Sequence, residues 1–569
     1  MNKQKLFEEI DRVLGKVPCD EKKLLKLIET ISGQEDFLVA VQKLLNYLKK
    51  SPLNWQVHFL AGNIFQNLKN FDLSIHHLTR ATNLNKELFQ GFNNCGVAYL
   101  AIKNKEKACE MFMKALQINP YFKDALLNLA IHYYGLGELS NAFNACKRIL
   151  EFDKQDSQVL FLYGNILRDL KRYEEALQNY DMALIFDTKN PSLFSNRGNI
   201  LRTIGLYEMA IDSYDQAIFL DPNFSESHCN KGSTLRFLND LEEAIPCFDR
   251  ALKIDPRSVS ALVDKGMTLM TLGKLEEGLP LYEYRWENES FKALKKDRNA
   301  PLWDGKTSLQ SKRILIHAEQ GFGDTIQFCR YAFNIISIGG TPILEVPPTL
   351  VSLLETLSPR CQVFPTGSIT PKYDFHCPIM SLPLCFKTNL SNIPCPEPYL
   401  SADPKKVKLW KEKLEYTKKQ KKIGIIWSGN PDHLNDANRS IELKQFLDFL
   451  PENLTYYSLQ KDVQKQDRKI LSTAKNIRHF SDSLNDFSDT AAYASNLDLI
   501  ITVDTGLAHL CGALGIKTWI VLPLNADWRW FRCRDDTPWY QSVSLFRQIV
   551  FGKWEDPFQN LREQLHEFL

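Results

Sequence analysis

The residues best suited to hold a phosphate group follow an apolar run near the C-terminus. Residues 499–503 have the length and composition of a buried parallel strand, and residues 504–506, Asp-Thr-Gly, follow directly. The helix expected next would begin with free backbone N–H groups, which carry partial positive charge and bind phosphate without a lysine. His509 lies four positions after Thr505, so both side chains share one helix face. The sequence therefore predicts a diphosphate site; the alternative is that Asp504 only caps the helix and that His509 packs in the core.

A candidate general base follows the first apolar strand of the C-terminal half, which we expect at residues 313–317. Gly321 and Gly323 permit a tight turn and close approach of a ligand, and Asp324 opens the next helix. A carboxylate in this place could take a proton from an acceptor hydroxyl or amide. The alternative role of Asp324 is a plain helix N-cap. The segment matches neither a Walker A loop nor the full dinucleotide-binding fingerprint.

Polar residues also follow two strands that we expect at residues 423–427 and 454–459. Ligands bind at the carboxyl ends of the strands in open parallel sheets, so these residues should face the same site. They are Ser428, Asn430 and Gln460, with Gly429 between the first two, and we expect Gln460 to meet the base or ribose of a nucleotide.

Two further groups could complete the site with positive charge and aromatic surface. Arg439 is our candidate cation for the charge of a leaving group, and a surface salt bridge is the alternative. Trp528 and Arg529 lie just past the last expected strand, where they would stack on a sugar or base or form a packed lid between domains. The chain contains no Asp-x-Asp sequence, so we expect no metal clamp.

These candidates occupy similar places in a pattern of alternating strands and helices, which is typical of doubly wound parallel sheets. The strands are expected at residues 313–317, 343–346, 361–364, 374–377, 423–427, 454–459, 477–480, 499–503 and 518–522. The helices are expected at residues 325–336, 404–416 and 556–568. The second half is therefore predicted to be α/β, with two Rossmann-like domains, 312–420 and 421–569, facing a cleft.

The first half has a different pattern, an internal repeat with a period of 34 residues. Small residues recur at Gly62, Gly96, Ala130, Gly164, Gly198, Gly232 and Gly266, and an apolar side chain lies sixteen positions after each, from Leu78 to Tyr282. Such a period predicts stacked helix pairs that form a superhelix. The α-helical array is expected over residues 21–290, with an N-terminal cap at 1–20 and a linker at 291–311.

A polar residue recurs two positions before most of the small residues of the repeat. The members are Asn94, Asn128, Asn196, Asn230 and Asp264. Asparagine offers a donor and an acceptor together, which suits an extended peptide backbone. Leu60 and Leu162 interrupt the series. The alternative is that these amides hydrogen-bond neighbouring helices of the array.

Composition excludes several classes of function. The net charge is +2 in 569 residues, so neither nucleic acid nor an anionic membrane is an expected partner. No apolar run reaches the ~18–20 residues that span a bilayer. The 13 cysteines contain no Cys-x-x-Cys pair, so they indicate neither zinc nor a redox motif, and we expect a reducing cytoplasm.

Residues 300–555 resemble the heptosyltransferase-type glycosyltransferases of the GT-B fold, in the variant that is fused to tetratricopeptide repeats in bacterial proteins. The matching motifs lie at residues 319–331, 503–515 and 527–530, together with 282–286 and 301–305. The resemblance implies inverting sugar transfer from a nucleotide-sugar, without metal or bound cofactor. It implies Asp324 as the base and Asp504, Thr505, Gly506 and His509 as the residues that hold the diphosphate.

The asparagine series is similar to the concave asparagine ladder of the eukaryotic protein O-GlcNAc transferases, which holds the acceptor polypeptide. Similar fused proteins include flagellin glycosyltransferases, so flagellin or another surface protein is an expected acceptor. Two other functions stay open. The chain could modify a lipid or polysaccharide while its repeats bind an assembly partner, or it could be a scaffold without catalytic activity.

Overall fold

The computed structural model describes residues 3–14, 23, 34–292, 298–319, 321–369, 371–395, 398–414, 421–433 and 435–569. Parts of the expected cap (15–20) and linker (293–297), and the segment 415–420, lie outside the described residues. The chain divides into two compact units, Met1–Pro222 and Asn223–Leu569. The domain boundaries expected from the sequence stay predictions. None of the described helices is long and apolar enough to cross a membrane.

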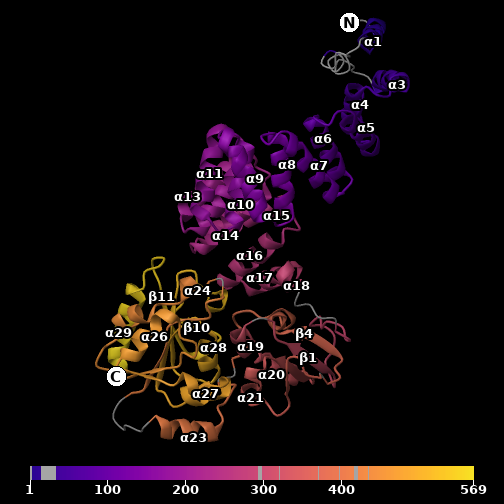
Figure 1. Ribbon diagram of the computed structural model, residues 1–569. Coiled ribbons are helices and arrows are strands. Elements are labelled where there is room, and N and C mark those ends of the chain that lie inside the picture. Colours follow the sequence, from indigo (N-terminus) through magenta and orange to yellow (C-terminus); the bar gives the residue numbers. More distant parts are fainter. Residues whose placement is uncertain are drawn as a thin grey trace. The chain divides into compact units, whose positions relative to one another are not determined.

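The first unit consists of helices that stack as antiparallel pairs (Figure 1). Its helices are α1 (Lys3–Leu14), α3 (Gln34–Lys50), α4 (Trp55–Asn67), α5 (Phe71–Leu84), α6 (Phe89–Ala101), α7 (Lys105–Ile118), α8 (Lys123–Gly135), α9 (Leu139–Phe152), α10 (Ser157–Asp169), α11 (Tyr173–Phe186), α12 (Pro191–Thr203) and α13 (Tyr207–Leu220). The second unit begins with two more pairs, α14 (Ser225–Phe237), α15 (Leu241–Ile254), α16 (Val259–Thr271) and α17 (Leu275–Tyr282).

The 34-residue period has the physical cause that the sequence indicates. A Cβ atom added to Gly96 would lie 2.5 Å from the ring of Phe112, and one added to Gly164 would lie 2.5 Å from the ring of Tyr180. In these pairs the first helix therefore needs a glycine where the large side chain of the second helix fills the crossing, whereas the smaller Cys146 leaves room for Ala130. Phe112 and Tyr180 are fully buried. The predicted helix pairs are confirmed.

The rest of the second unit is α/β. Its first part contains η1 (Glu283–Glu287), α18 (Glu289–Lys292), β1 (Arg313–His317), α19 (Phe322–Phe328), α20 (Tyr331–Ser337), β2 (Thr341–Val346), η2 (Pro348–Leu350), α21 (Val351–Leu354), β3 (Gln362–Pro365), β4 (Phe375–Pro378), η3 (Ile379–Ser381) and α22 (Leu382–Cys385). These strands form a parallel four-stranded sheet of order β3-β2-β1-β4.

The second part begins after α23 (Pro404–Lys413) and contains a seven-stranded sheet of order β10-β11-β9-β8-β5-β6-β7. Its elements are β5 (Ile423–Ile426), α24 (Asp436–Arg439), α25 (Leu443–Asp448), β6 (Tyr456–Ser458), α26 (Lys465–Thr473), β7 (Ile477–His479), η4 (Ser481–Ser483), α27 (Phe487–Ala494), β8 (Leu499–Val503), α28 (Gly506–Ala513), β9 (Thr518–Leu522), η5 (Trp528–Trp530), β10 (Asp536–Thr537), β11 (Tyr540–Arg547) and α29 (Glu555–Phe568). The described pairings are parallel except between β10 and β11. The predicted fold class, helical repeats followed by α/β, is confirmed.

Two details differ from the sequence prediction. The helix expected at 325–336 is broken into α19 and α20, because the chain tightens there: the N–H of Ala332 bonds to the carbonyl of Cys329, three residues back, at 2.9 Å. The hairpin of β10 and β11 was not expected. Strand β11 joins the sheet beside β9 and alternates buried and accessible residues, so it lacks the continuous apolar run of the central strands.

One hydrophobic core joins the last repeats to both sheets. Leu275 and Leu279 of α17 belong to the same buried cluster as Ile314 of β1 and Trp530 of η5. Each of these side chains is at most 3% exposed. The last helix pair therefore packs as part of the α/β unit.

Candidate active site

Three loops at the carboxyl ends of parallel strands meet at one place. They follow β1, β8 and β9, and they carry Asp324, the segment 504–506 and Asp527 respectively. A Cβ atom on Gly323 would lie 2.8 Å from Cδ2 of His509 and 3.2 Å from the Cα atom of Gly506. The loop after β1 and helix α28 thus touch at a point where only a glycine fits.

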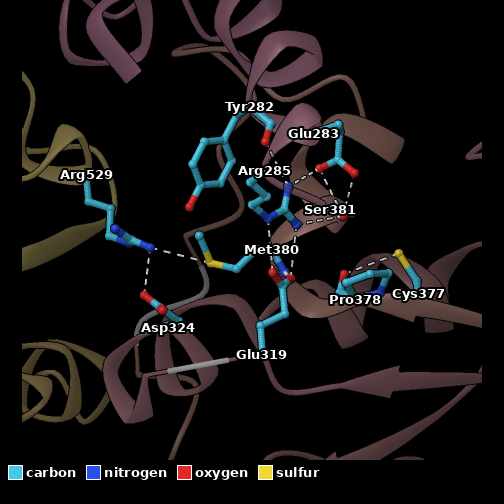
Figure 2. Close-up of polar contacts among 10 residues, drawn as sticks. All are labelled: Tyr282, Glu283, Arg285, Glu319, Asp324, Cys377, Pro378, Met380, Ser381 and Arg529. Carbon is cyan, nitrogen blue, oxygen red and sulfur yellow. Dashed lines mark hydrogen bonds and ion pairs between the residues drawn. The ribbon is translucent and has the colours of Figure 1, made fainter. Parts of the chain in front are cut away.

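Arg529 links the two sheets at this point. Its Nη2 donates to Oδ1 of Asp324 at 2.6 Å, and its Nη1 donates to Oδ1 of Asp527 at 2.6 Å (Figure 2 shows the bond to Asp324). The side chain of Arg529 is 8% exposed, and its Nε is buried without a partner among the described residues. The Nη2 also contacts Sδ of Met380 at 3.4 Å. A buried guanidinium with an unused donor is well suited to bind an anion.

Asp504 and Asp527 have opposite pKa shifts. Burial and the charge of Asp527 raise the pKa of Asp504 to about 6. Burial also acts to raise the pKa of Asp527, but the charge and hydrogen bonds of Arg529 outweigh it and hold that pKa below its usual value. A carboxyl group that is partly protonated near neutral pH repels a diphosphate less than an ionised one does.

His509 is a buried, neutral imidazole. Burial and the charge of Arg529 lower its pKa to about 3. Its Nδ1 lies 3.0 Å from the hydroxyl of Tyr540, and its ring stacks on Trp530 with centroids 5.0 Å apart. His509 can therefore act as a hydrogen-bonding group but not as a cation.

The start of α28 retains its backbone donors. Thr505 is the N-cap residue, and no side chain in the described chain makes a capping bond there. Asp504 and Asp324 are not N-caps, since Gly321 holds that position in α19. The alternative role that the sequence left open for Asp324 and Asp504, that of a helix N-cap, is therefore not found in the structure.

Arg439, the last residue of α24, faces the same site from the segment that follows β5. Its Nε donates to Asp436 at 3.2 Å, and no bond of its two Nη groups is found among the described residues. Burial and nearer charges dominate the pKa values of Asp504 and His509, and the positive charge of Arg439 acts to lower both. A Cβ atom on Gly429 would lie 2.7 Å from Nη2 of Arg439.

Other predicted residues have structural partners in this loop region. The amide of Gln460 bonds to the backbone N–H of Ser428 at 3.3 Å, to its carbonyl at 3.0 Å and to the carbonyl of Asp462 at 3.0 Å. Asn430 is exposed and accepts the N–H of Asp432 at 3.0 Å. The three bonds of the Gln460 side chain fix the loop that contains Ser428. The hydroxyl of Ser428 is buried and has no partner in the described structure.

Trp528 packs in the core. It is 4% exposed, and its ring lies against Phe328 with centroids 6.2 Å apart. The guanidinium of Arg529 lies 4.8 Å from the centroid of the Trp528 ring. Trp528 therefore packs in the core, as expected for a packed lid, and its ring contacts the guanidinium of Arg529. Of these two predicted residues, only Arg529 lies at the candidate site.

The repeat residues of the asparagine series bridge neighbouring helices. In the first unit, Nδ2 of Asn94 donates to Asn63 at 2.8 Å, that of Asn128 to Asn93 at 2.9 Å and that of Asn196 to Asn165 at 2.9 Å. In the second unit, Asp264 accepts the hydroxyl of Ser233, and Nδ2 of Asn230 is buried without a partner among the described residues. Asn94, Asn128 and Asn196 therefore hydrogen-bond neighbouring helices of the array, which was the alternative to peptide binding.

The sequence prediction did not include a buried ion pair next to the site. Arg285 donates Nε and Nη2 to the two carboxylate oxygens of Glu319, both at 3.1 Å, and each side chain is 2% exposed (Figure 2). Arg285 also bonds to Ser381 at 3.0 Å and to Glu283 at 2.5 Å. The motif at residues 282–286 marks Arg285 in the sequence, but its partner Glu319 lies 34 positions away, so the ion pair could not be predicted from local spacing.

A second buried arginine was also missed. Arg330 is fully buried and donates to the carbonyls of Gln327, Pro394 and Trp539, at 2.8, 3.1 and 2.6 Å, and to the hydroxyl of Tyr399 at 2.9 Å. It links Gln327 of α19 to the residue before β11, and its guanidinium lies 4.6 Å from the ring centroid of Tyr540, whose hydroxyl contacts His509. Within the described residues, no group of three His, Cys, Asp or Glu side chains could hold a metal ion.

Comparison with known proteins identifies the helical half of the chain. The models named "Tetratricopeptide repeat" match residues 90–122, 191–224 and 225–258, and the model named "TPR repeat" matches residues 164–205. The N-terminal helices form a tetratricopeptide-repeat array.

Three similar proteins each match part of the chain. "Protein FlbA" of Caulobacter vibrioides is 24% identical over 47% of this chain and 48% of its own length. A "UDP-N-acetylglucosamine--peptide N-acetylglucosaminyltransferase" of Giardia intestinalis is 24% identical over 19% of this chain and 8% of its own. The solved structure titled "Functional Characterization of Pseudomonas Aeruginosa pilF" is 23% identical, covers 37% of this chain and 99% of its own, and has a TM-score of 0.32. The matches span less than half the length of the first curated relatives.

Proposed function

We propose that this tetratricopeptide-repeat protein is a glycosyltransferase of the GT-B type, which moves a sugar from a nucleotide-sugar to a polypeptide. The observation that supports it is the meeting of Asp324, after β1 of one parallel sheet, with the N-terminus of α28, after β8 of the other. A carboxylate and a phosphate-binding helix terminus are the two groups that inverting transfer without a metal requires.

The charges at the site fit the departure of a diphosphate. Arg529, with its unused Nε, and Arg439, with its two Nη groups, face the region of the uncapped N-terminus of α28. As the bond between the anomeric carbon and the diphosphate breaks, negative charge grows on the leaving oxygens. Fixed cations and backbone dipoles stabilise that charge in the transition state.

Asp324 completes the reaction on the opposite face of the sugar. It takes the proton from the acceptor hydroxyl or amide, whose lone pair forms the new bond to the anomeric carbon, and the nucleoside diphosphate leaves with inversion. In the structure without ligand, Asp324 is paired with Arg529. When the diphosphate attracts Arg529, the carboxylate oxygen that accepts from Arg529 becomes free to accept the proton of the acceptor group.

The repeats support a polypeptide as the acceptor. Tetratricopeptide arrays offer long helical surfaces for extended ligands, and the Giardia relative, which matches in part, is named for transfer to a peptide. We propose that the acceptor is a surface protein, such as flagellin, that is modified in the cytoplasm before export. Transfer to lipid or polysaccharide, or a scaffold without activity, are the competing outcomes.

A thermal-shift panel with UDP-, GDP-, ADP- and CMP-sugars tests the donor half of this proposal. A donor at 100 times its Kd should stabilise the protein by about 2.7 kcal/mol. The shift should shrink in Arg439→Ala and persist in Arg478→Ala, an exposed arginine of the same sheet. Incubation of the stabilising donor with separate protein, lipid and polysaccharide fractions then shows where the sugar goes. No shift with any donor would contradict the proposal.

A further inference from the structure

The last repeat helix supplies a side chain to the candidate active site. Tyr282 is the final residue of α17, and Figure 2 shows its ring directed toward Met380 and Arg529. The positive charge of Arg529 and the negative charge of Asp324 both act on its hydroxyl, after the larger effects of burial and Arg285. The Tyr282 hydroxyl is therefore close to the two groups that define the site.

The position of Tyr282 is fixed by a chain of contacts. The guanidinium of Arg285 lies 4.7 Å from the centroid of the Tyr282 ring, and its Nη1 bonds to the Tyr282 carbonyl at 3.3 Å. Arg285 is in turn held by both oxygens of Glu319, which also accepts the N–H of Met380 at 2.9 Å. A tyrosine held this rigidly presents its hydroxyl without a large entropic cost.

The Tyr282 hydroxyl is an available donor. It has no hydrogen-bond partner among the described residues, although its ring packs against the hydrophobic core and Figure 2 shows the polar groups of Arg529 and Asp324 on the side of its hydroxyl. Burial raises the pKa of Tyr282 to about 12, so the phenol keeps its proton at neutral pH. A half-buried O–H without a partner gains most from a ligand that supplies an acceptor atom.

We propose that the Tyr282 hydroxyl positions the acceptor polypeptide, by donating to one of its carbonyl oxygens beside Asp324. This inference rests on the proposed function. The acceptor is a better match than the donor because Tyr282 is anchored through Arg285 and Glu319 to the loop after β1, which carries Asp324. The diphosphate site lies after β8, on the other sheet. The repeat array and the site of chemistry thus share one residue.

The test compares wild type with Tyr282→Phe, which removes only the hydroxyl, and with Tyr284→Phe, a control whose ring is 47% exposed. Three quantities are measured: the KM for the acceptor polypeptide, the Kd for the stabilising donor, and the rate at which the donor is hydrolysed by water. Loss of one neutral hydrogen bond should raise the acceptor KM of Tyr282→Phe about three- to tenfold. Its donor Kd and hydrolysis rate should match those of wild type and Tyr284→Phe.

Four other results would contradict the inference, and the three measured quantities distinguish them. An unchanged acceptor KM in Tyr282→Phe would overturn it while leaving the proposed function intact. A raised donor Kd would place the hydroxyl on the donor side and overturn it as well. A lower melting temperature with all three quantities changed together would show a structural role instead. If wild type transfers sugar to no polypeptide, the proposed function fails, and this inference fails with it.

Discussion

The guanidinium of Arg529 donates to the carboxylate of Asp324 at 2.6 Å and so joins the loops after β9 and β1, which belong to different sheets. This ion pair stabilises the contact between the sheets and also occupies one carboxylate oxygen of Asp324. Since a bound diphosphate competes for the same cation, we expect the donor to bind before Asp324 can act on an acceptor.

Replacement of the proposed base should stop transfer without preventing donor binding. In Asp324→Asn the rate of transfer should fall about 10²- to 10⁴-fold, because the acceptor proton has no group to receive it. The thermal shift caused by the donor should remain, since Arg529 keeps Asp527 as a partner and stays in place. Initial rates of transfer measure the effect, with the exposed Asp535→Asn as the control. A transfer rate within twofold of wild type would exclude Asp324 as the base.

Removal of one partner of the Arg285–Glu319 pair should strongly destabilise the second unit. Both side chains are 2% exposed, so Arg285→Met leaves a carboxylate buried without a cation, and this costs about 3–5 kcal/mol. Burial already raises the pKa of Glu319, although Arg285 opposes that shift. The double variant Arg285→Met/Glu319→Gln should recover part of the loss. Urea unfolding measures the free energies, and equal stability of all three proteins would show that the pair contributes little.

Asp504 should make the stability of the protein fall as the pH rises. Its pKa is about 6 in the folded state and about 3.9 in unfolded chains, so folding favours the protonated form. The stabilisation is complete below pH ~4 and is lost as the pH rises through about 6. Asp504→Asn should therefore gain stability relative to wild type between these values, by on the order of 2–3 kcal/mol. Unfolding free energies from pH 4 to 7.5 measure the difference, and a constant difference would contradict the burial of an ionisable Asp504.

A methyl group at Gly323 should separate the two loops of the site. Its Cβ would lie 2.8 Å from Cδ2 of His509 and 3.2 Å from the backbone of Gly506, and backbone atoms cannot yield easily. We expect Gly323→Ala to lower both donor stabilisation and transfer at least tenfold, because misplacement by 1 Å can cost 10²-fold. Gly135→Ala, where no atom lies within 4 Å of the added Cβ, is the matched control. Normal activity of Gly323→Ala would show that the two loops do not meet in the working enzyme.

Alanine substitutions in the asparagine series should change the free energy of unfolding in two different ways. Asn196 donates to Asn165 at 2.9 Å, so Asn196→Ala should lower the unfolding free energy by about 1 kcal/mol. The buried Nδ2 of Asn230 has no partner among the described residues, so Asn230→Ala should leave stability unchanged or raise it slightly. Chemical denaturation of both variants measures this contrast. The opposite order would indicate that Asn230 has a partner when the protein is in solution.

The sequence predicted the parts of the structure that depend on local pattern. The 34-residue spacing indicates helix pairs because a small residue of the first helix must meet an apolar side chain of the second at each crossing. The central strands are continuous apolar runs, so β8 and β9 lie where they were expected. Strand β11 was missed because it lies near the edge of its sheet and alternates in polarity.

Pairings between distant residues could not be predicted in the same way. Arg285 and Glu319, or Arg529 and Asp324, come together only when the last repeat and both sheets pack into one core. Gln460 was expected at the nucleotide, but its amide bonds to the backbone of Ser428 and Asp462. A side chain at the end of a strand can serve the loop or the ligand, and its sequence position does not distinguish the two.

The core that α17 shares with β1 determines where this protein can be recombined with others. If repeat arrays are exchanged by a cut after α18, Leu275 and Leu279 become exposed on the first fragment. On the second fragment, Glu319 loses its ion pair with Arg285. A cut before α14, at the boundary between Pro222 and Asn223, leaves those contacts within one fragment. Chimeras built at the second position should remain soluble and keep their donor preference, so acceptor choice can be altered by exchanging the repeats that precede α14.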